Sequence, residues 1–474
     1  MTVPSAPTQE ITTKQRLMLF VLLGAGFMLS VDFSIMTVAL PRLGAGVGLS
    51  LASLPWVAAA YALPAAGFTL LFGRLADLFG RRRQFMAGMF LLIGASLLGG
   101  FAPSAALLLS ARALQGLATA LVAPAALSLL TSTFRDGPIR ARILGINGAL
   151  LSAGFTVGTL IGGVLVGLLS WRAAFFINVP VAVVILLLTP SLVTGSKVRE
   201  RPKFDLPGSV TVTIGLLAAV YAIIEKNVIA AVIGVLLLAA FWVIERRSSA
   251  PIAPPRVLKR PTVKWGNYAG VVVFSMETAM IFLMTLYLQR VLGFSPLSAG
   301  VILGVPGLAA VVAGVIAGRL IGRFGTRRIL ALGMSVQGLS ILPLVFLSSG
   351  RISLAFMIPV LFISFFGHVT SIVAYTVTAT SGLPNEEQGL VAGMTTMSQQ
   401  VGITIGIPIL SAIVAMRRTQ LAGTRLALSV DVAVTLASMV LIWFGLRQRD
   451  ETPAAGTAQK SEADDEVEPA ALPM

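Results

Sequence analysis

The sequence predicts an all-α, polytopic membrane protein, and two observations carry that prediction. Hydrophobic residues make up 56% of the 474-residue chain, charged residues make up only 11%, and the mean hydropathy is +0.91. A soluble domain with this composition would expose a largely hydrocarbon surface to water. In addition, the apolar residues fall into runs of about 17–27 residues, which suits helices that cross about 30 Å of hydrocarbon at about 1.5 Å per residue.

Fourteen such runs follow one another, and each is expected to form a transmembrane helix. They lie near residues 17–38, 53–74, 84–101, 105–131, 143–168, 173–193, 207–224, 227–244, 266–288, 296–318, 329–348, 352–378, 390–415 and 427–446. The seventh and eighth runs are short and are separated only by a few residues around Lys226, which predicts a tight hairpin. Six runs precede this pair and six follow it, so the predicted arrangement is 6 + 2 + 6.

This arrangement divides the chain into five predicted parts. They are a cytoplasmic N-terminus (1–16), a six-helix bundle (17–200), a two-helix insert (201–250), a second six-helix bundle (251–449) and a disordered acidic tail (450–474). The tail is rich in Ala, Pro and acidic residues, a composition that cannot bury enough apolar surface to fold. The N-terminus lacks the pattern of a cleaved signal peptide, so the first helix is expected to be retained.

Lys and Arg residues orient the predicted helices, because cytoplasmic loops of membrane proteins are enriched in them. The loops on one side carry basic clusters near residues 81–83, 135–142, 197–203, 246–264 and 323–328. Loops on the other side carry only isolated basic residues up to the twelfth run, so both termini are expected on the cytoplasmic side of a cell membrane. Three residues contradict this orientation, because Arg417, Arg418 and Arg425 fall in a predicted outer loop.

Composition also excludes several function classes. Cysteine is absent, which excludes disulfides, thiolate metal sites and cysteine nucleophiles. The single histidine, His368, cannot form a multi-histidine metal site. The net charge is +16, but the Lys and Arg residues that produce it lie in short turns between apolar runs. This distribution is typical of membrane proteins, so nucleic-acid binding is disfavoured. We therefore expect no cofactor, no metal and no enzymatic activity.

A basic turn occurs twice, each time between two apolar runs. The first copy, from Gly73 to Arg83, reads G-R-L-A-D-L-F-G-R-R-R, and the second, from Gly318 to Arg328, reads G-R-L-I-G-R-F-G-T-R-R. Such a repeat between membrane helices is typical of a duplicated transporter. Asp77, the only acidic residue in either copy, corresponds to Gly322 in the second.

Four motifs in the first six runs resemble those of the major facilitator superfamily, and most closely its fourteen-helix branch of drug:proton antiporters. They are the turn from Gly73 to Arg83, Asp32 in V-D-F-S-I-M-T-V-A-L-P, Arg112-x-x-Gln115-Gly116, and the fifth-run glycines Gly154, Gly158, Gly162 and Gly163. The stretches Trp171–Pro180 and Tyr287-Leu288-Gln289 are also similar to this branch. The glycine motif normally carries a proline where this chain has Thr159, which puts the associated helix bend in doubt.

The resemblance implies proton-coupled efflux of lipophilic or cationic small molecules, such as drugs and antibiotics, by a monomer in the lipid bilayer. Its partners would be a small-molecule substrate and protons. An exporter dedicated to one metabolite, such as a self-made antibiotic, amino acid or siderophore, stays open as an alternative, and a non-transporting membrane sensor is a third. The resemblance also implicates Arg112 in proton coupling and the fifth-run glycines in export.

The first copy of the turn is interpreted as a conformational latch made of Gly73, Asp77, Gly80, Arg81 and Arg82. Asp77 loses solvation at a helix end unless it is paired, so we expect it to bond across the interface between the two bundles and hold one access state. The arginines also serve as cytoplasmic anchors. The fifth-run glycines permit close backbone approach, and ordinary helix packing explains them as well as a special antiport role does.

Three charged residues fall inside the predicted hydrocarbon region, where a charge is costly and is a functional candidate. Asp32 lies roughly 22 Å from the inner surface and Arg112 roughly 10 Å below the outer surface, so in a layer of about 30 Å their depths nearly coincide. They are expected to pair or to share a cavity, either for proton coupling or as a structural ion pair.

Glu277 lies near the midplane and has no obvious charged partner in the sequence. A carboxylate that gains a proton when facing one side and releases it when facing the other couples transport to protons. Glu277 is therefore a candidate for proton coupling or for binding a cationic substrate. The alternative is a neutral, hydrogen-bonded structural carboxyl. His368 is expected mainly to bond between helices.

Overall fold

The computed structural model describes residues 12–134, 138–193, 205–249, 251, 255–381 and 385–446. The regular structure within these ranges is entirely helical. Among the described residues, twelve helical segments are long and apolar enough to cross a membrane. The predicted all-α membrane architecture is therefore confirmed at this level. Most of the predicted N-terminal part and the whole of the predicted tail (450–474) lie outside the described residues.

The helices up to residue 192 form one bundle. They are α1 (Thr13–Gly46), the short η1 (Leu51–Ser53), α2 (Pro55–Phe79), α3 (Arg81–Gly100), α4 (Ala105–Thr133), α5 (Pro138–Val164), a π-helical turn η2 (Leu165–Leu169), α6 (Ala173–Phe176) and α7 (Asn178–Leu192). Helix α1 begins at a capping box, in which Thr12 and Gln15 satisfy each other's backbone N–H groups. Ser104 caps α4 in a similar way by accepting from the Leu107 N–H.

A helical hairpin follows, as the sequence predicts. It consists of α8 (Leu206–Glu225) and α9 (Val228–Arg247). Asp205 caps the start of α8, Lys226 ends it in a left-handed conformation with φ of 51°, and Asn227 caps α9. Lys226 ends the first helix and Asn227 begins the second, so the connection needs no further loop residues.

The second bundle begins after the four-residue helix α10 (Pro255–Leu258). It contains α11 (Pro261–Leu286) with the π-helical turn η3 (Tyr287–Val291), α12 (Pro296–Gly304), α13 (Gly307–Phe324), α14 (Thr326–Ile341) with η4 (Leu342–Phe346), α15 (Ser353–Thr380), α16 (Asn385–Val414) and α17 (Gln420–Gly445). The predicted single run 296–318 is interrupted between α12 and α13. Pro306 lacks the N–H that a continuous helix needs there.

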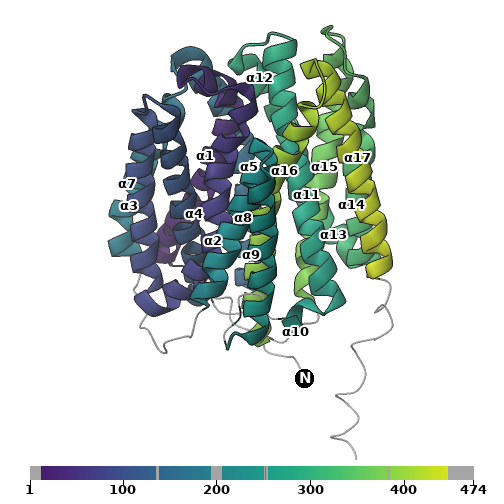
Figure 1. The fold of residues 1–474 in the computed structure, drawn as a ribbon. Coiled ribbons are helices and arrows are strands. Elements are labelled where there is room, and N and C mark those ends of the chain that lie inside the picture. Colours follow the sequence, from purple (N-terminus) through teal and green to yellow (C-terminus); the bar gives the residue numbers. More distant parts are fainter. Residues whose placement is uncertain are drawn as a thin grey trace, which may run out of the picture.

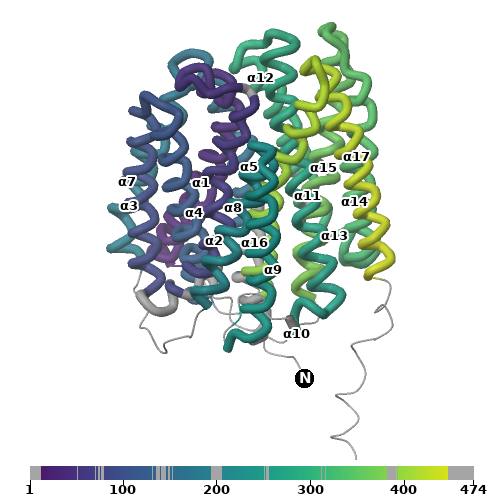
Figure 2. Tube along the Cα trace, in the orientation of Figure 1, coloured from purple at the N-terminus to yellow at the C-terminus, as the bar shows by residue number. Residues whose placement is uncertain are grey.

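The two bundles lie side by side, and the hairpin covers the seam between them (Figure 1). Helix α2 packs on α16, α5 packs on α12 and α13, and α8 contacts both α2 and α16. The trace in Figure 2 shows the teal hairpin standing between the blue first bundle and the green second bundle. The start of α1, helix α10 and the end of α17 all lie at the lower end in this view.

Hydrophobic packing joins the bundles mainly at the opposite, upper end. One buried cluster combines Ile35 and Leu43 of α1 with Phe282 and Leu283 of α11. A second buried cluster also crosses the seam, because it combines Tyr61 of α2 with residues of α11, α14, α15, α16 and α17. The cluster around Phe85, in contrast, belongs to the first bundle alone. Burial of apolar surface stabilises whatever contact it occurs in, so both clusters that cross the seam hold the bundles together.

The two copies of the basic turn have the same backbone conformation. Gly80 and Gly325 occupy equivalent places between helices, with φ of 93° and 80°, values that favour glycine. Arg81 donates to the Ser128 carbonyl of α4 at 3.3 Å, and Arg327 donates to the Trp443 carbonyl of α17 at 3.1 Å. The side chain of Asp77 lies outside the described residues, so its predicted bond across the interface stays a prediction.

The glycines of α5 serve two different contacts. A Cβ atom on Gly158 would lie 2.7 Å from the Val31 carbonyl oxygen of α1, and Gly154 and Gly162 meet α1 in the same manner. Only Gly163 faces the other bundle, where its Cβ would lie 3.1 Å from the Gly300 Cα of α12. Close approach is therefore confirmed, but most of it lies within the first bundle, and only Gly163 lies at the interface between bundles.

Replacing Gly158 with alanine tests this packing. The added methyl has no room beside Val31, so α1 and α5 must separate, and we expect a loss of about 1–3 kcal/mol in stability. The control is Gly94→Ala in α3, where nothing lies within 4 Å of the new methyl. Alanine's better helix propensity should leave the control as stable as the wild type or slightly more so. Thermal unfolding of the purified protein in detergent measures both, and equal midpoints would contradict the close contact.

Candidate functional site

An ion pair lies inside the first bundle. Arg112 of α4 donates through Nη1 to Asp32 Oδ2 of α1 at 3.2 Å, and the two side chains are 1% and 0% exposed. The sequence expectation that these residues meet is therefore confirmed. Neither charge contacts water in this arrangement, so the pair needs further polar partners to remain stable.

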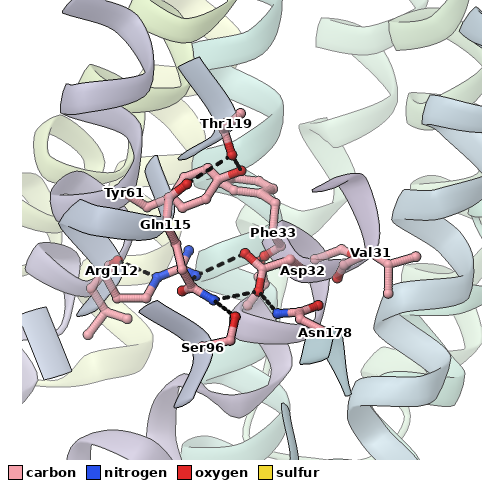
Figure 3. A network of polar contacts seen from close by, with 12 residues as sticks. Val31, Asp32, Phe33, Tyr61, Ser96, Arg112, Gln115, Thr119 and Asn178 are labelled. Carbon is pink, nitrogen blue, oxygen red and sulfur yellow. Dashed lines mark hydrogen bonds and ion pairs between the residues drawn. The ribbon is translucent and has the colours of Figure 1, made fainter. Parts of the chain in front are cut away.

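Polar side chains of α4 itself and of two further helices provide these partners (Figure 3). Gln115 of α4 donates to Asp32 Oδ1 at 3.1 Å, and Asn178 at the start of α7 donates to the same oxygen. Gln115 Oε1 accepts from Arg112 Nη1 at 2.7 Å, while its Nε2 also donates to Ser96 of α3. Both oxygens of the carboxylate thus accept hydrogen bonds, and helices α1, α3, α4 and α7 meet at one network.

An aromatic side chain connects this network to the seam between the bundles. The Arg112 guanidinium lies over the ring of Tyr61, 4.4 Å from its centroid, and the Arg112 Nε donates to the Val57 carbonyl. The Tyr61 hydroxyl bonds to Thr119 at 2.8 Å. Tyr61 belongs to α2, which packs on α16 of the second bundle. A shift of α2 against α16 would therefore change the surroundings of Arg112 directly.

A second polar cluster occupies the interior of the second bundle. Glu277 of α11 is 1% exposed and accepts from Gln337 Nε2 of α14 at 3.2 Å. His368 Nδ1 of α15 lies 3.9 Å from Glu277 Oε2. The sequence offers Glu277 no obvious charged partner at its depth, and the structure places an ionisable side chain, His368, beside it. The position of a residue in an apolar run predicts only its depth in the membrane. The contact between Glu277 and His368 depends in addition on how α11 and α15 are rotated toward each other.

Asp431 is a further buried carboxylate that the sequence interpretation did not treat as buried. The predicted run 427–446 would place Asp431 close to its first residue, at a membrane surface, but α17 begins at Gln420 and Asp431 lies about three turns into it. Its side chain is fully buried, with one oxygen accepting from Thr435 at 3.3 Å. Sequence could have shown this, because Thr419 is an N-cap residue that marks the earlier helix start.

The two clusters differ in how completely their polar atoms are satisfied. In the first network both Asp32 oxygens are bonded and Asn178 Oδ1 lacks a partner, whereas the second bundle contains more buried polar atoms with no hydrogen-bond partner among the described residues. They include Glu277 Oε1, Gln337 Oε1, His368 Nδ1, Ser364 Oγ and Asp431 Oδ2. Unsatisfied buried polar groups are costly and therefore need a functional or solvent partner. The second cluster thus has the free positions that protons, water or a polar ligand would fill.

No group of three or more His, Asp or Glu side chains that would suit a metal ion occurs among the described residues. The side chains of these two clusters can form ion pairs and hydrogen bonds and can exchange protons. Such groups inside a membrane helix bundle are typical of substrate and proton pathways.

A family model described as Major Facilitator Superfamily matches residues 22–407, which covers both bundles and the hairpin. The chain belongs to this superfamily. The four motifs of the first bundle and the duplicated turn are thus family features, and the chain is a membrane transporter by family.

Superfamily relatives with similar sequences are exporters and resistance proteins. The chain is 34% identical to the cephamycin export protein CmcT of Amycolatopsis lactamdurans, over 81% of this chain and 82% of the relative. It is also 34% identical to the puromycin resistance protein pur8 of Streptomyces alboniger, over 91% and 92%. The multidrug resistance protein Stp of Mycobacterium tuberculosis is 32% identical over 85% and 76%.

Solved structures support the superfamily fold. A POT family peptide transporter in an auto-inhibited form superimposes with a TM-score of 0.68 at 15% identity and covers 92% of this chain and 99% of that one. The human organic anion transporter MFSD10 gives 0.64 at 14% identity, with 91% and 100% covered. At this level of identity the likeness concerns the fold alone.

Breaking the Asp32–Arg112 pair on one side should destabilise the transporter more than removing both charges. Arg112→Gln leaves a buried carboxylate without a cation, and we expect a loss of about 3–5 kcal/mol. The double variant Asp32→Asn/Arg112→Gln replaces the charges with amides that can bond to each other, so part of that loss should be recovered. Thermal unfolding in detergent measures the series. A double variant no more stable than Arg112→Gln would show that the two side chains are not electrostatically coupled.

Proposed function

We propose that this superfamily member exports lipophilic or cationic small molecules, including antibiotics and other drugs, in exchange for protons. The observation that carries the proposal is the buried, incompletely satisfied cluster around Glu277 in a chain whose relatives are antibiotic and multidrug exporters. A buried carboxyl with one unpartnered oxygen can bind a proton or a cationic group but not both, and this competition couples the two movements.

The coupling would use the residues around Glu277. Protonation neutralises the carboxyl and leaves Gln337 as its hydrogen-bond donor, whereas the ionised form favours a cation in the same place. His368, at 3.9 Å, is the nearest titratable group that faces Glu277, and Asp431 adds a second carboxyl in the same bundle. Asp32 and Arg112 form the second candidate for proton coupling, in which the proton would compete with the guanidinium for Asp32.

Alternating access is part of the same proposal. One hydrophobic cluster joins the bundles at the upper end of the molecule, and a second joins Tyr61 of α2 to the second bundle. In the proposed cycle such contacts between the bundles break and re-form as access alternates between the two sides of the membrane. Gly73, Asp77, Gly80, Arg81 and Arg82 would form the latch that closes the side of the termini in one conformer.

The proposed topology has fourteen spans in a 6 + 2 + 6 arrangement, with both termini in the cytoplasm and the monomer as the working unit in the cell membrane. Two features support it. Helices α2 and α5 occupy the two predicted runs that are not among the twelve span-length segments. The start of α1 and the end of α17 lie at the same end of the molecule (Figure 1).

Export of a single antibiotic is the alternative, and it is favoured by the likeness to a cephamycin export protein. Growth inhibition of a host that lacks its own efflux pumps separates the two possibilities. A multidrug exporter should raise the inhibitory concentration of several structurally unrelated lipophilic cations, by about fourfold or more each. Protection against one chemical class alone would identify a dedicated exporter, and the variant Glu277→Gln provides the inactive control.

Everted membrane vesicles test proton coupling directly. With an imposed proton gradient, adding a substrate found in the growth assay should partly collapse the gradient in the wild type. Glu277→Gln cannot change charge, so substrate-dependent collapse should disappear, whereas substrate–substrate exchange without a gradient should continue if Glu277 is the proton site. Loss of exchange as well would assign Glu277 to substrate binding. Asp32→Asn tests the second candidate in the same way.

The matched control is Glu225→Gln, which removes an exposed carboxylate at the hairpin turn that bonds only to the Trp56 indole among the described residues. It should collapse the gradient as the wild type does. Normal coupled transport in both Glu277→Gln and Asp32→Asn would refute the assignment of these carboxylates. Absence of transport in the wild type for every compound would favour the non-transporting sensor.

A further inference from the structure

A cavity lies on the side of the molecule away from the termini, where the two bundles meet the hairpin. It has a volume of about 440 Å³, and its walls come from the start of α2, the α8–α9 turn, α11, and the junction between α16 and α17. Its apolar lining includes Ile224 of the hairpin, Phe282 and Leu286 of α11, and Val414 of α16. This volume suits a small ligand or one hydrocarbon chain.

Three basic residues also line this cavity. They are Lys226 at the hairpin turn and Arg417 and Arg418 at the junction of α16 and α17. All three side chains are exposed, and no acidic residue lies among the lining residues. Within the described part of the chain, no ion pair or hydrogen bond is found for any of the three side chains. The nearest acidic residue in sequence, Glu225, accepts a hydrogen bond from Trp56 at 3.0 Å.

Basic residues are unexpected at this cavity. Lys and Arg are enriched in cytoplasmic loops of membrane proteins, and the proposed cytoplasmic side is the side of the termini. Arg425, the third outer arginine, has a structural role, because its Nε donates to the Leu347 carbonyl at 2.7 Å. No such partner is found for Arg417 and Arg418 in the part of the chain that the structure describes. Their position at the cavity gives a physical reason for basic residues on this side, since an anion held there would neutralise them.

Two unpartnered polar atoms give independent support. Ser411 Oγ and Gln420 Nε2 are buried and have no hydrogen-bond partner among the described residues, and both residues line the cavity. Both atoms can donate a hydrogen bond. The cavity therefore combines hydrogen-bond donors, cationic side chains and an apolar wall.

We propose that this cavity binds an anionic amphiphile, with its phosphate or carboxylate group near Lys226, Arg417 and Arg418 and its hydrocarbon part against Phe282 and Leu286. The same chemistry occurs in a phospholipid of the outer leaflet and in a free single-chain amphiphile. Because the walls come from both bundles and the hairpin, an occupant favours the conformer in which these three parts are in contact. The site is independent of the proton chemistry proposed for Glu277.

Binding to the full-length protein in phosphatidylcholine nanodiscs tests the proposal. One arm titrates phosphatidylglycerol, an anionic two-chain lipid, and the other titrates dodecyl phosphate, a soluble single-chain anion. Mass spectrometry of the released complexes counts the molecules retained. We expect one anionic molecule per chain, with its affinity reduced about tenfold or more in the triple variant Lys226→Gln/Arg417→Gln/Arg418→Gln. The arm that shows this dependence identifies the source of the amphiphile.

A triple variant of Arg42, Arg290 and Arg351 to Gln is the matched control, because it removes the same charge from outer positions that do not line the cavity. It should bind like the wild type. Ala412→Phe fills the cavity without changing charge and should also reduce binding. Equal affinity of the cavity triple variant and the wild type for both anions, or an equal loss in the control, would overturn the proposal.

Discussion

A charge placed in hydrocarbon must be neutralised, and this constraint determines how the first bundle is assembled. Asp32 and Arg112 come from α1 and α4, and each brings its helix to the same point in the interior. The pair alone would not offset the loss of water, because desolvation of two charges costs several kcal/mol per ion. Gln115 and Asn178 supply the remaining donors, so α7 is drawn to the same network. Hydrophobic surfaces can slide past one another, but this set of bonds fixes one register among the helices.

The second bundle has the same helical architecture as the first, but in the described ranges its interior does not contain a carboxylate–guanidinium pair at Glu277. Its duplicated turn has the same backbone as the first, with a left-handed glycine at Gly80 and Gly325. Its interior, however, holds Glu277 with an amide and a neutral-or-cationic histidine in place of a guanidinium. A guanidinium stays protonated under all physiological conditions, whereas histidine and a carboxyl exchange protons. In this conformer the first bundle is therefore held by an ion pair with a guanidinium, whereas the second contains a carboxyl and an imidazole that can both change charge.

Sequence alone predicted features that depend on local composition, and it failed where rotation about a helix axis matters. Hydropathy placed the apolar runs and the hairpin around Lys226, because each depends only on residues close in sequence. Depth arguments brought Asp32 and Arg112 together, since both residues have a similar predicted depth and lie on helices that pack against each other. The contact between Glu277 and His368 escaped prediction because depth does not say which face of α11 meets α15. Asp431 was misplaced because the apolar run begins later than its helix, which starts at the Thr419 cap.

Glycine placement shows why the interface between bundles can be both tight and movable. Gly154, Gly158 and Gly162 of α5 lie in close contact with α1, so α5 packs tightly within the first bundle. Gly163 and Gly300 meet across the seam with almost no side chain between them. Contacts between backbones without interlocking side chains exclude lipid and water but offer little resistance to a small rotation. A polar network that fixes the first bundle internally, combined with close backbone contact at this point of the seam, would favour movement of the two halves as rigid bodies in the proposed transport cycle.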